Sequence, residues 1–547
     1  MELSGLLFGT AYYMDELCSQ EIREDLSAMR AANITFVRVG DRSWPYWEPR
    51  QGEYDLSRLY EVLTLSRKQN IKVLLTLPGD FLPEWLKGAE YPAIQKQNDL
   101  LIYRLVSVVK DYRDMVAFQV DAHALGGKLA QHQCSLLRQL LGDNVTVVTF
   151  ADSSFGQNIG EGAILGCPVY HEAGLKNTGA ELTLRGDAAR GDRPYLVLET
   201  QCQGRLGQLP YPGQLRLWAF HHIASGARGL SYWHWRSETK AGSNWKGVVG
   251  YGGSKSRAYQ EVSAIGQEFC QLGSHLAGLR KQNRVAILVS PTSARNMPEC
   301  GGKSYDDILR WICTSFYRLN IEVDLIDDRS RDFSQYALVV TPCLYSAEDD
   351  LIMALRNYTA EGGCLISTFR SFFTDSRGEI RRGQQPYGMT DVFGMHYEEF
   401  TVPEETCLPE YVAEVSDFME ILEPEEAVSL AIYDSPAWRG RSAATCSRFG
   451  KGQAAYFGCY SEEGFEPILL RMLAMWHIPV PETSWPVVQK RAIGPTGKML
   501  TFLLHYSPAS RVISSPATGT ELFSGKRLDE GEPLELRGWD VKILEGD

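Results

Sequence analysis

Polar and aromatic side chains recur directly after predicted β-strands in the first half of the sequence. The candidates for a chemical site are Asp41, Asp80, Asp121, His123, Asp152, Tyr170, His171, Glu199, Trp233, Trp235 and Trp245. Carboxylates can attack or protonate a glycosidic centre, and flat aromatic rings can stack on the C–H faces of sugars. Many strand-end carboxylates only cap helices or form ion pairs, and tryptophans can simply close a barrel. Taken together, the residue types favour a carbohydrate site.

Glu199 is the sharpest of these candidates. It ends the apolar run Tyr-Leu-Val-Leu at 195–198, which predicts a fully buried strand. A carboxylate at the end of such a strand can attack an anomeric carbon and later depart as a leaving group. We therefore interpret Glu199 as a nucleophile.

The elements that position these residues follow a (β/α)8 pattern. Helix-length segments separate the β-type runs, and the amphipathic stretch 21–32 is the clearest of them. The runs are Leu6–Tyr13, Ile34–Val39, Ile71–Leu77, Met115–Asp121, Val145–Phe150, Ala163–Tyr170, Tyr195–Glu199 and Gly229–Trp235. Eight such runs are the number that closes a TIM barrel, in which chemistry lies at the carboxyl ends of the strands. We place this barrel at residues 1–282.

Two further domains are predicted after the barrel. Residues 283–484 contain a βαβ series that begins with the strand Arg-Val-Ala-Ile-Leu-Val-Ser at 284–290, so we expect a flavodoxin-like α/β domain. No Gly-x-Gly-x-x-Gly turn occurs there, and we predict no dinucleotide or other cofactor. Residues 485–547 carry short alternating runs that indicate a small antiparallel β-domain or β-sandwich.

Composition excludes several other classes of protein. The net charge of −13 argues against nucleic acid and anionic membranes as partners, because both bind a basic face. No apolar run approaches the roughly 20 residues of a membrane span. The N-terminal residues lack a signal peptide, and the twelve scattered cysteines form no Cys-x2-Cys pair. We therefore expect a cytoplasmic protein without a bound metal.

Several short segments occur in the order typical of one enzyme family. They are FVRVG at 36–40, SW at 43–44, EP at 48–49, GEYD at 52–55, FQVD at 118–121, LETQ at 198–201, SYWHWR at 231–236 and RAYQEV at 257–262. This pattern resembles glycoside hydrolase family 42, the β-galactosidase-type enzymes of clan A. The resemblance implies a retaining glycosidase with Glu199 as nucleophile and Arg38 holding that nucleophile or substrate hydroxyls. It also implies a middle domain used for trimerisation, and hence a homo-oligomer.

The sequence departs from this family at the acid/base position. The family has Asp-Asn-Glu where this chain has Asp121-Ala122-His123, so a histidine replaces the acid/base glutamate. A retaining glycosidase uses two carboxyls about 5–5.5 Å apart. Three hypotheses stay open: His123 is the acid/base, a neighbouring carboxylate is, or the site binds sugar without efficient turnover. The neighbouring candidates are Asp121, Asp80, Asp152 and Asp41. A lyase or transglycosylase with His123 as base is a further alternative.

Substrate identity is also open at the sequence level. After strand eight the family usually supplies a glutamate and a histidine for galactose, but residues 241–246 read Ala-Gly-Ser-Asn-Trp-Lys. We expect a β-linked, galactoside-like or modified sugar. Arg236, His234 and Lys246 would favour an acidic one. The span between His123 and Glu199 is too short for the extra helices and cysteine-bound zinc of some members.

Overall fold

The computed structural model describes residues 5–122, 124–152, 164–191, 195–204, 209–238 and 245–547. The chain folds as two compact units. One comprises Met1–Lys281 and Gln489–Asp547, and the other comprises Gln282–Val488. The C-terminal strands from Gln489 onward therefore belong to the same compact unit as the barrel.

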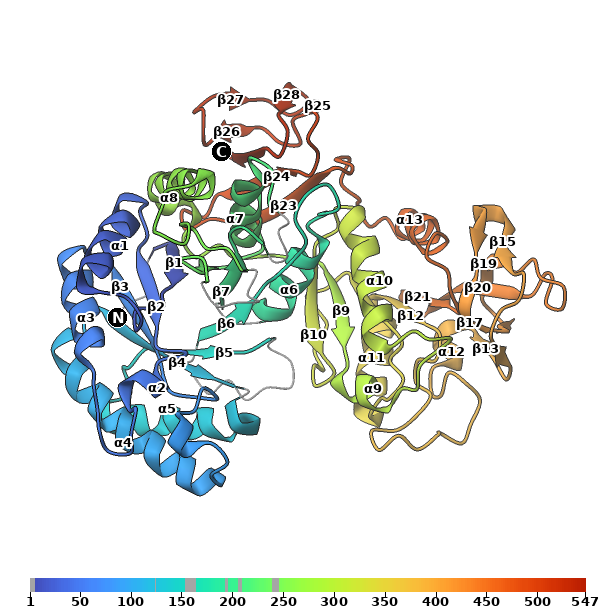
Figure 1. Ribbon diagram of the computed structural model, residues 1–547. Helices are drawn as coiled ribbons and strands as arrows, with labels where there is room; N and C mark the ends of the chain where they lie inside the picture. The colour runs from blue at the N-terminus through green and yellow to red at the C-terminus, as the bar shows by residue number, and fades with distance from the viewer. Residues whose placement is uncertain (1–4, 123, 153–163, 192–194, 205–208, 239–244) are drawn as a thin grey trace. The chain divides into compact units, whose positions relative to one another are not determined.

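The first unit contains a closed parallel barrel, as the strand pattern predicts (Figure 1). Each strand pairs in parallel with the next, and β8 pairs with β1 to close the ring. The strands are β1 (Leu7–Ala11), β2 (Phe36–Val39), β3 (Lys72–Thr76), β4 (Val116–Asp121), β5 (Val147–Phe150), β6 (Ile164–Pro168), β7 (Tyr195–Gln201) and β8 (Gly229–Trp233). All eight overlap the predicted runs.

Helices surround this barrel with their apolar faces turned inward. In α1 the buried residues Ile22, Leu26 and Met29 recur at helical spacing, which explains why this stretch folds as a helix against the strands. The helices are α1 (Ser19–Ala31), α2 (Trp44–Trp47), α3 (Ser57–Lys68), α4 (Tyr91–Val109), α5 (Lys128–Leu141), α6 (Ala180–Arg190), α7 (Gln214–Ala224) and α8 (Arg257–Leu276). Single turns of 3-10 helix add Glu84–Leu86, Lys110–Tyr112 and Ala124–Gly127.

Large and small side chains interdigitate inside the barrel. The interior cluster consists of Leu7, Phe36, Leu74, Ala117, Val148, Leu196 and Leu198. Gly166 on β6 is required by this packing, because a Cβ atom there would lie 2.3 Å from Cδ1 of Leu198. The packing of Leu196 and Leu198 thus fixes the part of β7 that precedes Glu199.

The C-terminal strands pack on α7 and α8 of the same unit. His221 of α7 hydrogen-bonds with Tyr506, and Phe220 packs edge-on against Phe523. One sheet has the order β23-β24-β29-β26-β27, and β25 pairs with β28. The strands are β23 (Val487–Ile493), β24 (Met499–His505), β25 (Arg511–Ser514), β26 (Gly519–Glu521), β27 (Arg527–Leu528), β28 (Pro533–Leu536) and β29 (Val541–Glu545).

The second unit is built on a seven-stranded sheet of order β10-β9-β11-β12-β21-β20-β19. Its first five strands in this order are parallel, and their sequence order 2-1-3-4-5 is that of flavodoxin-like folds. The strands are β9 (Val285–Val289), β10 (Val323–Asp327), β11 (Leu338–Thr341), β12 (Cys364–Thr368), β19 (Val428–Ile432), β20 (Ser442–Phe449) and β21 (Gly452–Phe457). The predicted βαβ series is therefore confirmed, with an antiparallel edge added by β20 and β19.

Helices and short strands complete this second unit. The helices are α9 (Pro291–Asn296), α10 (Tyr305–Arg318), α11 (Asp349–Glu361), α12 (Thr390–Phe393) and α13 (Phe465–Met475). The short elements are β13 (Met395–His396), β14 (Phe400–Thr401), β15 (Cys407–Leu408), the 3-10 turn Pro409–Tyr411, β16 (Ala413–Glu414), β17 (Ser416–Glu420), β18 (Glu423–Pro424) and β22 (Cys459–Tyr460).

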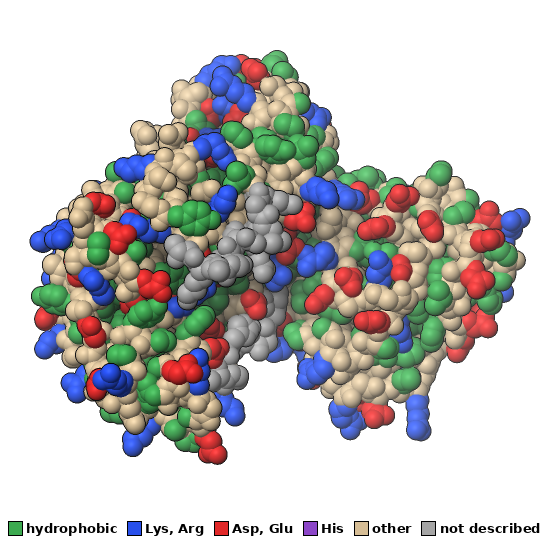
Figure 2. All heavy atoms as spheres, viewed as in Figure 1, with side chains coloured by type: hydrophobic (Ala, Val, Ile, Leu, Met, Phe, Trp, Pro, Cys, Tyr) green, Lys and Arg blue, Asp and Glu red, His purple; other side chains and the backbone are tan. Residues whose placement is uncertain are grey.

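Charged side chains of both signs lie on one face of the molecule. On the face shown in Figure 2, Lys and Arg side chains are interspersed with Asp and Glu side chains. No helix within the described ranges is both long enough and apolar enough to cross a bilayer.

A buried carboxyl lies in the core of the second unit. Glu420, at the end of β17, is fully buried, and its Oε1 accepts a hydrogen bond of 2.7 Å from the Arg370 amide. Burial raises the pKa of Glu420 to about 8, although the Arg370 amide and guanidinium and the Tyr456 and Tyr397 hydroxyls act in the opposite direction. Glu420 is therefore protonated in the folded protein at neutral pH.

This carboxyl predicts a pH-dependent stability that Glu420→Gln should flatten. An unfolded glutamate ionises near pH 4.3, so between about pH 4.3 and 8 the folded state holds one more proton than the unfolded state. Stability consequently falls as pH rises through this window, by at most about 1.4 kcal/mol per pH unit. Urea unfolding of the full chain at pH 5, 6.5 and 8 should show a smaller decline for the variant. Glu361→Gln, at an exposed site on α11, is the control, and identical pH curves for wild type and Glu420→Gln would contradict the prediction.

Candidate functional site

A β-bulge directs Glu199 toward the inside of the barrel. On β7, Leu196 and Leu198 face the interior, so strict alternation would turn Glu199 outward. The pairing of β7 with both of its neighbours is irregular at this point. The consecutive residues Cys167 and Pro168 of β6 pair with residues 197 and 199 of β7, so residue 198 is skipped. The pairing of β7 with β8 shifts between residues 197 and 200. A bulge of this kind re-aims the next side chain. Glu199 therefore reaches Arg38, which extends from the interior side of β2.

Glu199 and Asp41 share the guanidinium of Arg38. Arg38 Nη1 lies 2.6 Å from Glu199 Oε1, and Arg38 Nη2 lies 3.1 Å from Asp41 Oδ2. Arg38 is only 3% exposed, whereas the Glu199 side chain keeps 14% of its surface exposed. Burial opposes the charge of Arg38, but Glu199 and Asp41 outweigh it and raise the pKa of Arg38. The guanidinium therefore stays charged and fixes the carboxylate in place.

Two tyrosines complete the hydrogen bonding of these carboxylates. Tyr170 Oη donates to Glu199 Oε2 at 2.8 Å, and Tyr13 Oη donates to Asp41 Oδ2 at 3.1 Å. Burial, followed by the negative charge of Glu199, raises the pKa of Tyr170, so its hydroxyl remains a donor. Burial also raises the pKa of Asp41, against the opposing charge of the neighbouring arginines. Both oxygens of Glu199 are thus oriented by donors, as a positioned nucleophile requires.

An aromatic cluster lies beside Glu199. The rings of Tyr170, Trp233 and Trp245 contact one another, with centroid distances of 6.2 Å, 5.3 Å and 5.0 Å. Trp233 Nε1 also donates a hydrogen bond to Tyr13 Oη. Three of the predicted binding residues therefore gather next to the candidate nucleophile. Such a wall of rings suits the apolar face of a sugar.

The predicted carboxylates Asp80, Asp121 and Asp152 lie at or after the carboxyl ends of β3, β4 and β5. Asp121 ends β4 and is partly buried, and Asp80 and Asp152 are exposed in the loops after β3 and β5. His123 lies outside the described residues. The roles of these four residues stay predictions.

Two residues predicted to bind substrate point elsewhere. The ring of His171 packs edge-on against Trp218 of α7 at 4.2 Å, and burial lowers its pKa to about 4. Trp235 has no exposed surface and packs against Tyr259 of α8. Both side chains therefore fill the layer between the barrel and its helices. They follow the ends of β6 and β8, where side chains no longer alternate between the two faces of a strand.

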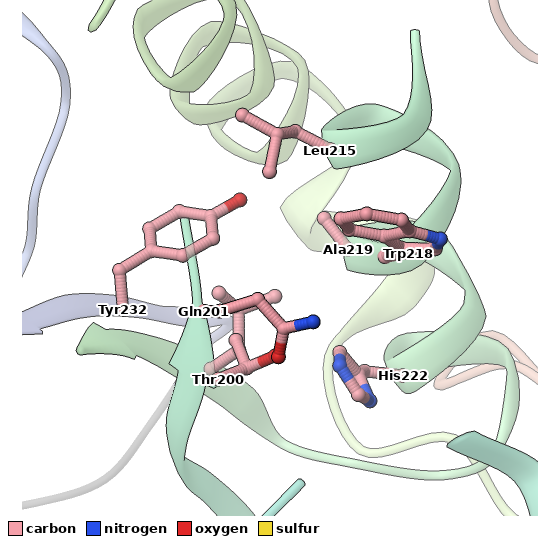
Figure 3. A pocket seen from close by; sticks show the side chains of 8 residues that line it. Thr200, Gln201, Leu215, Trp218, Ala219, His222 and Tyr232 are labelled. Carbon is pink, nitrogen blue, oxygen red and sulfur yellow. The ribbon is translucent and has the colours of Figure 1, made fainter. Parts of the chain in front are cut away.

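Figure 3 shows this layer behind β7. Side chains of Thr200, Gln201 and Tyr232 from the strands meet Trp218 and His222 from α7 around a small pocket. Burial lowers the pKa of His222 to about 3, so the ring is neutral. The pocket lies on the helix side of the barrel wall and contains none of the residues that hold Glu199.

The cations expected to favour an acidic sugar are largely committed elsewhere. Arg236 forms ion pairs with Asp25 and Glu21 of α1, at 2.7 Å and 3.1 Å. His234 is buried, and burial lowers its pKa to about 4. The charge of Arg236 is thus paired with carboxylates of α1, and the ring of His234 is neutral. Tyr13, Arg42 and Glu238 were not singled out from the sequence. They lie two, three and five residues after the ends of β1, β2 and β8, and this closeness to the strand ends was the available signal.

Comparisons with known proteins agree with this architecture. The family model described as beta-galactosidase matches residues 11–106 and 170–272, and the beta-galactosidase trimerisation domain matches residues 283–478. The chain belongs to glycoside hydrolase family 42. The matches to this family leave out residues 107–169, which contain Asp121 and His123.

Relatives in the family are similar over different lengths. Beta-galactosidase BgaB of Geobacillus sp. (strain Y412MC61) is 28% identical over 376 residues, which cover 65% of this chain and 55% of that protein. The match thus spans little more than half of that relative. Beta-galactosidase LacZ of Lactobacillus acidophilus is 20% identical over 99% of both chains.

Solved structures share the fold over the whole chain. A GH42 beta-galactosidase from G. stearothermophilus has a TM-score of 0.87 at 17% identity, covering 100% of this chain and 99% of that one. The beta-galactosidase from Bacillus circulans sp. alkalophilus has a TM-score of 0.85 at 16% identity, covering 100% of both chains. At these identities the likeness establishes the fold.

Proposed function

We propose that this protein is a retaining glycoside hydrolase that cleaves a β-linked, galactoside-like sugar with Glu199 as nucleophile. The observation that carries the proposal is the carboxylate of Glu199, held by Arg38 and Tyr170 beside an aromatic cluster. Relatives named beta-galactosidases support the substrate class. The match to the trimerisation domain supports a homotrimeric assembly.

The proposed reaction has two displacement steps. A Glu199 carboxylate oxygen attacks the anomeric carbon and forms an ester as the bond to the leaving oxygen breaks, and that oxygen takes a proton from an acid. Water then attacks the same carbon, gives its proton to the conjugate base, and frees Glu199. Tyr170 and Arg38 keep the nucleophile oriented throughout. The sugar leaves with its original anomeric configuration.

We assign the proton transfers to His123, which occupies the place of the family's glutamate. An imidazolium near neutral pH can supply and then recover the proton. Asp121, which ends β4 and lies two residues earlier in the sequence, is the alternative acid. Asp80, Asp152 and Asp41 are weaker candidates, and Asp41 is already paired with Arg38.

A sugar-binding protein without efficient turnover is the second candidate function. It is favoured by the lost glutamate and by the gap in the family match at residues 107–169. In that case the aromatic cluster and Arg38 would bind sugar, and no covalent intermediate would form.

Product stereochemistry tests the proposal. Wild-type protein should hydrolyse 2,4-dinitrophenyl β-galactoside, and proton NMR should show β-galactose as the first product. Release of α-galactose would exclude a covalent Glu199 intermediate. Absence of turnover on activated β-galactoside, β-glucoside and β-fucoside, with galactose binding retained in calorimetry, would instead support the binding protein.

A further inference from the structure

An ion pair that the sequence did not predict lies among the loops at the carboxyl ends of the strands. Arg42 follows β2 and Glu238 follows β8, and both strands neighbour β1 in the barrel. Arg42 Nη1 lies 2.9 Å from Glu238 Oε1. The side chains are 31% and 16% exposed, so solvent or a ligand reaches both.

Three aromatic rings hold the Arg42 guanidinium. Its central carbon lies 4.9 Å from the ring centre of Tyr13, 5.3 Å from that of Trp233 and 5.4 Å from that of Phe81. Cation–π contacts to several rings restrict the rotation of the side chain. The directions of its N–H donors are therefore set before a ligand arrives, which lowers the entropic cost of binding.

The hydrogen-bonding capacity of Arg42 exceeds its use by the protein. A guanidinium has five N–H donors. Nη1 donates to Glu238, and the buried Nε has no hydrogen-bond partner among the described residues. An oriented cation with unused donors is suited to oxygen atoms of a bound molecule.

This pair is adjacent to the candidate nucleophile. Trp233, which contacts Arg42, also contacts Tyr170, and Tyr170 donates to Glu199. One aromatic ring thus separates Arg42 from the tyrosine that orients Glu199. A sugar whose anomeric carbon meets Glu199 would extend its other carbons along these rings.

Charge decides which class of sugar fits. In the connected group of contacts, Arg38 and Arg42 face the carboxylates of Glu199, Asp41 and Glu238. Among the described residues of this group, the three carboxylates outnumber the two guanidinium groups, so a uronate or sulfate would meet net repulsion. Hydroxyls, in contrast, can both accept from a guanidinium and donate to a carboxylate.

We propose that Arg42 and Glu238 form a specificity-determining pair that binds two adjacent hydroxyls of a neutral sugar. Arg42 donates to one hydroxyl oxygen, and Glu238 accepts from the neighbouring hydroxyl. This inference rests on the proposed function, because it places the sugar ring beside Glu199. It narrows the substrate class to neutral glycosides with an intact vicinal diol.

Arg42→Gln and Glu238→Gln test the pair with matched substrates. Activity is measured on 4-nitrophenyl β-galactoside, its 3-deoxy, 4-deoxy and 6-deoxy analogues, and the corresponding β-galacturonide. Each variant should lower kcat/KM on the full galactoside about 10- to 100-fold, the effect of losing a hydrogen bond to a charged group. For each variant, the loss in kcat/KM should be smaller on the analogue that lacks the hydroxyl bound by the substituted residue. Wild type should show a lower kcat/KM on the galacturonide than on the galactoside. Arg50→Gln, from the exposed Arg50–Glu53 pair, is the control.

The outcomes separate this inference from the proposed function. Equal losses on all analogues would show a merely structural ion pair, and preference of wild type for the uronide would overturn the neutral-sugar assignment. If wild type turns over none of the glycosides, the proposed function fails. The pair is then tested by calorimetry with galactose and its deoxy analogues, where unchanged affinity in both variants would overturn it.

Discussion

Glu199→Gln should lower kcat/KM for 4-nitrophenyl β-galactoside by about 10⁵-fold, the scale seen when an enzyme loses its nucleophile. The amide keeps the size of the side chain but cannot form the glycosyl ester. Steady-state kinetics and intact-protein mass spectrometry check this result together. With a slow 2-fluoro substrate, wild type should gain the mass of one sugar and the variant should gain none.

Controls separate loss of chemistry from loss of structure. The Glu199→Gln substitution leaves the buried Arg38 with one anionic partner fewer, and breaking a buried pair can destabilise a protein by several kcal/mol. The unfolding midpoint of the variant is therefore measured alongside its activity. Glu172→Gln, an exposed substitution in the loop after β6, should retain wild-type rates. Sugar labelling of the Glu199→Gln variant would rule out Glu199 as the nucleophile.

The barrel was predictable because its signals are local. Each of its strands is a short apolar run, and helices such as α1 repeat buried residues at 3.6-residue spacing. The position of Glu199 at a strand end followed from the same pattern. Its direction did not, because the bulge that turns it inward depends on the pairing of β7 with two neighbouring strands.

Side chains beyond the strand ends were harder to predict. His171 and Trp235 lie a few residues past the end of a strand, where alternation no longer fixes direction, and both pack toward helices. The Arg42–Glu238 pair joins loops 196 residues apart in the sequence, so no local pattern reveals it. The packing of the C-terminal strands on α7 is likewise a tertiary contact that sequence periodicity does not contain.

His123→Ala should slow substrates in proportion to how much protonation their leaving groups need. General acid catalysis contributes about 10²- to 10⁴-fold, so methyl β-galactoside should lose that much in kcat/KM. Dinitrophenolate departs without a proton, so the first step on 2,4-dinitrophenyl β-galactoside should be nearly unchanged. Pre-steady-state bursts measure that step directly. The limb of the pH–rate profile that reports an acid near neutrality should also disappear.

The dependence on leaving group distinguishes the remaining hypotheses. His132→Ala, on α5 and paired with Asp99 in wild type, is a histidine control that should leave the ratio between the two substrates unchanged. If His123→Ala lowers both substrates equally, His123 binds sugar or supports the fold and does not transfer the proton. If it lowers neither, Asp121→Asn should produce the leaving-group dependence instead. On an activated substrate the burst reports the attack of Glu199, because the leaving group needs no proton. The burst therefore tests the nucleophile independently of the acid.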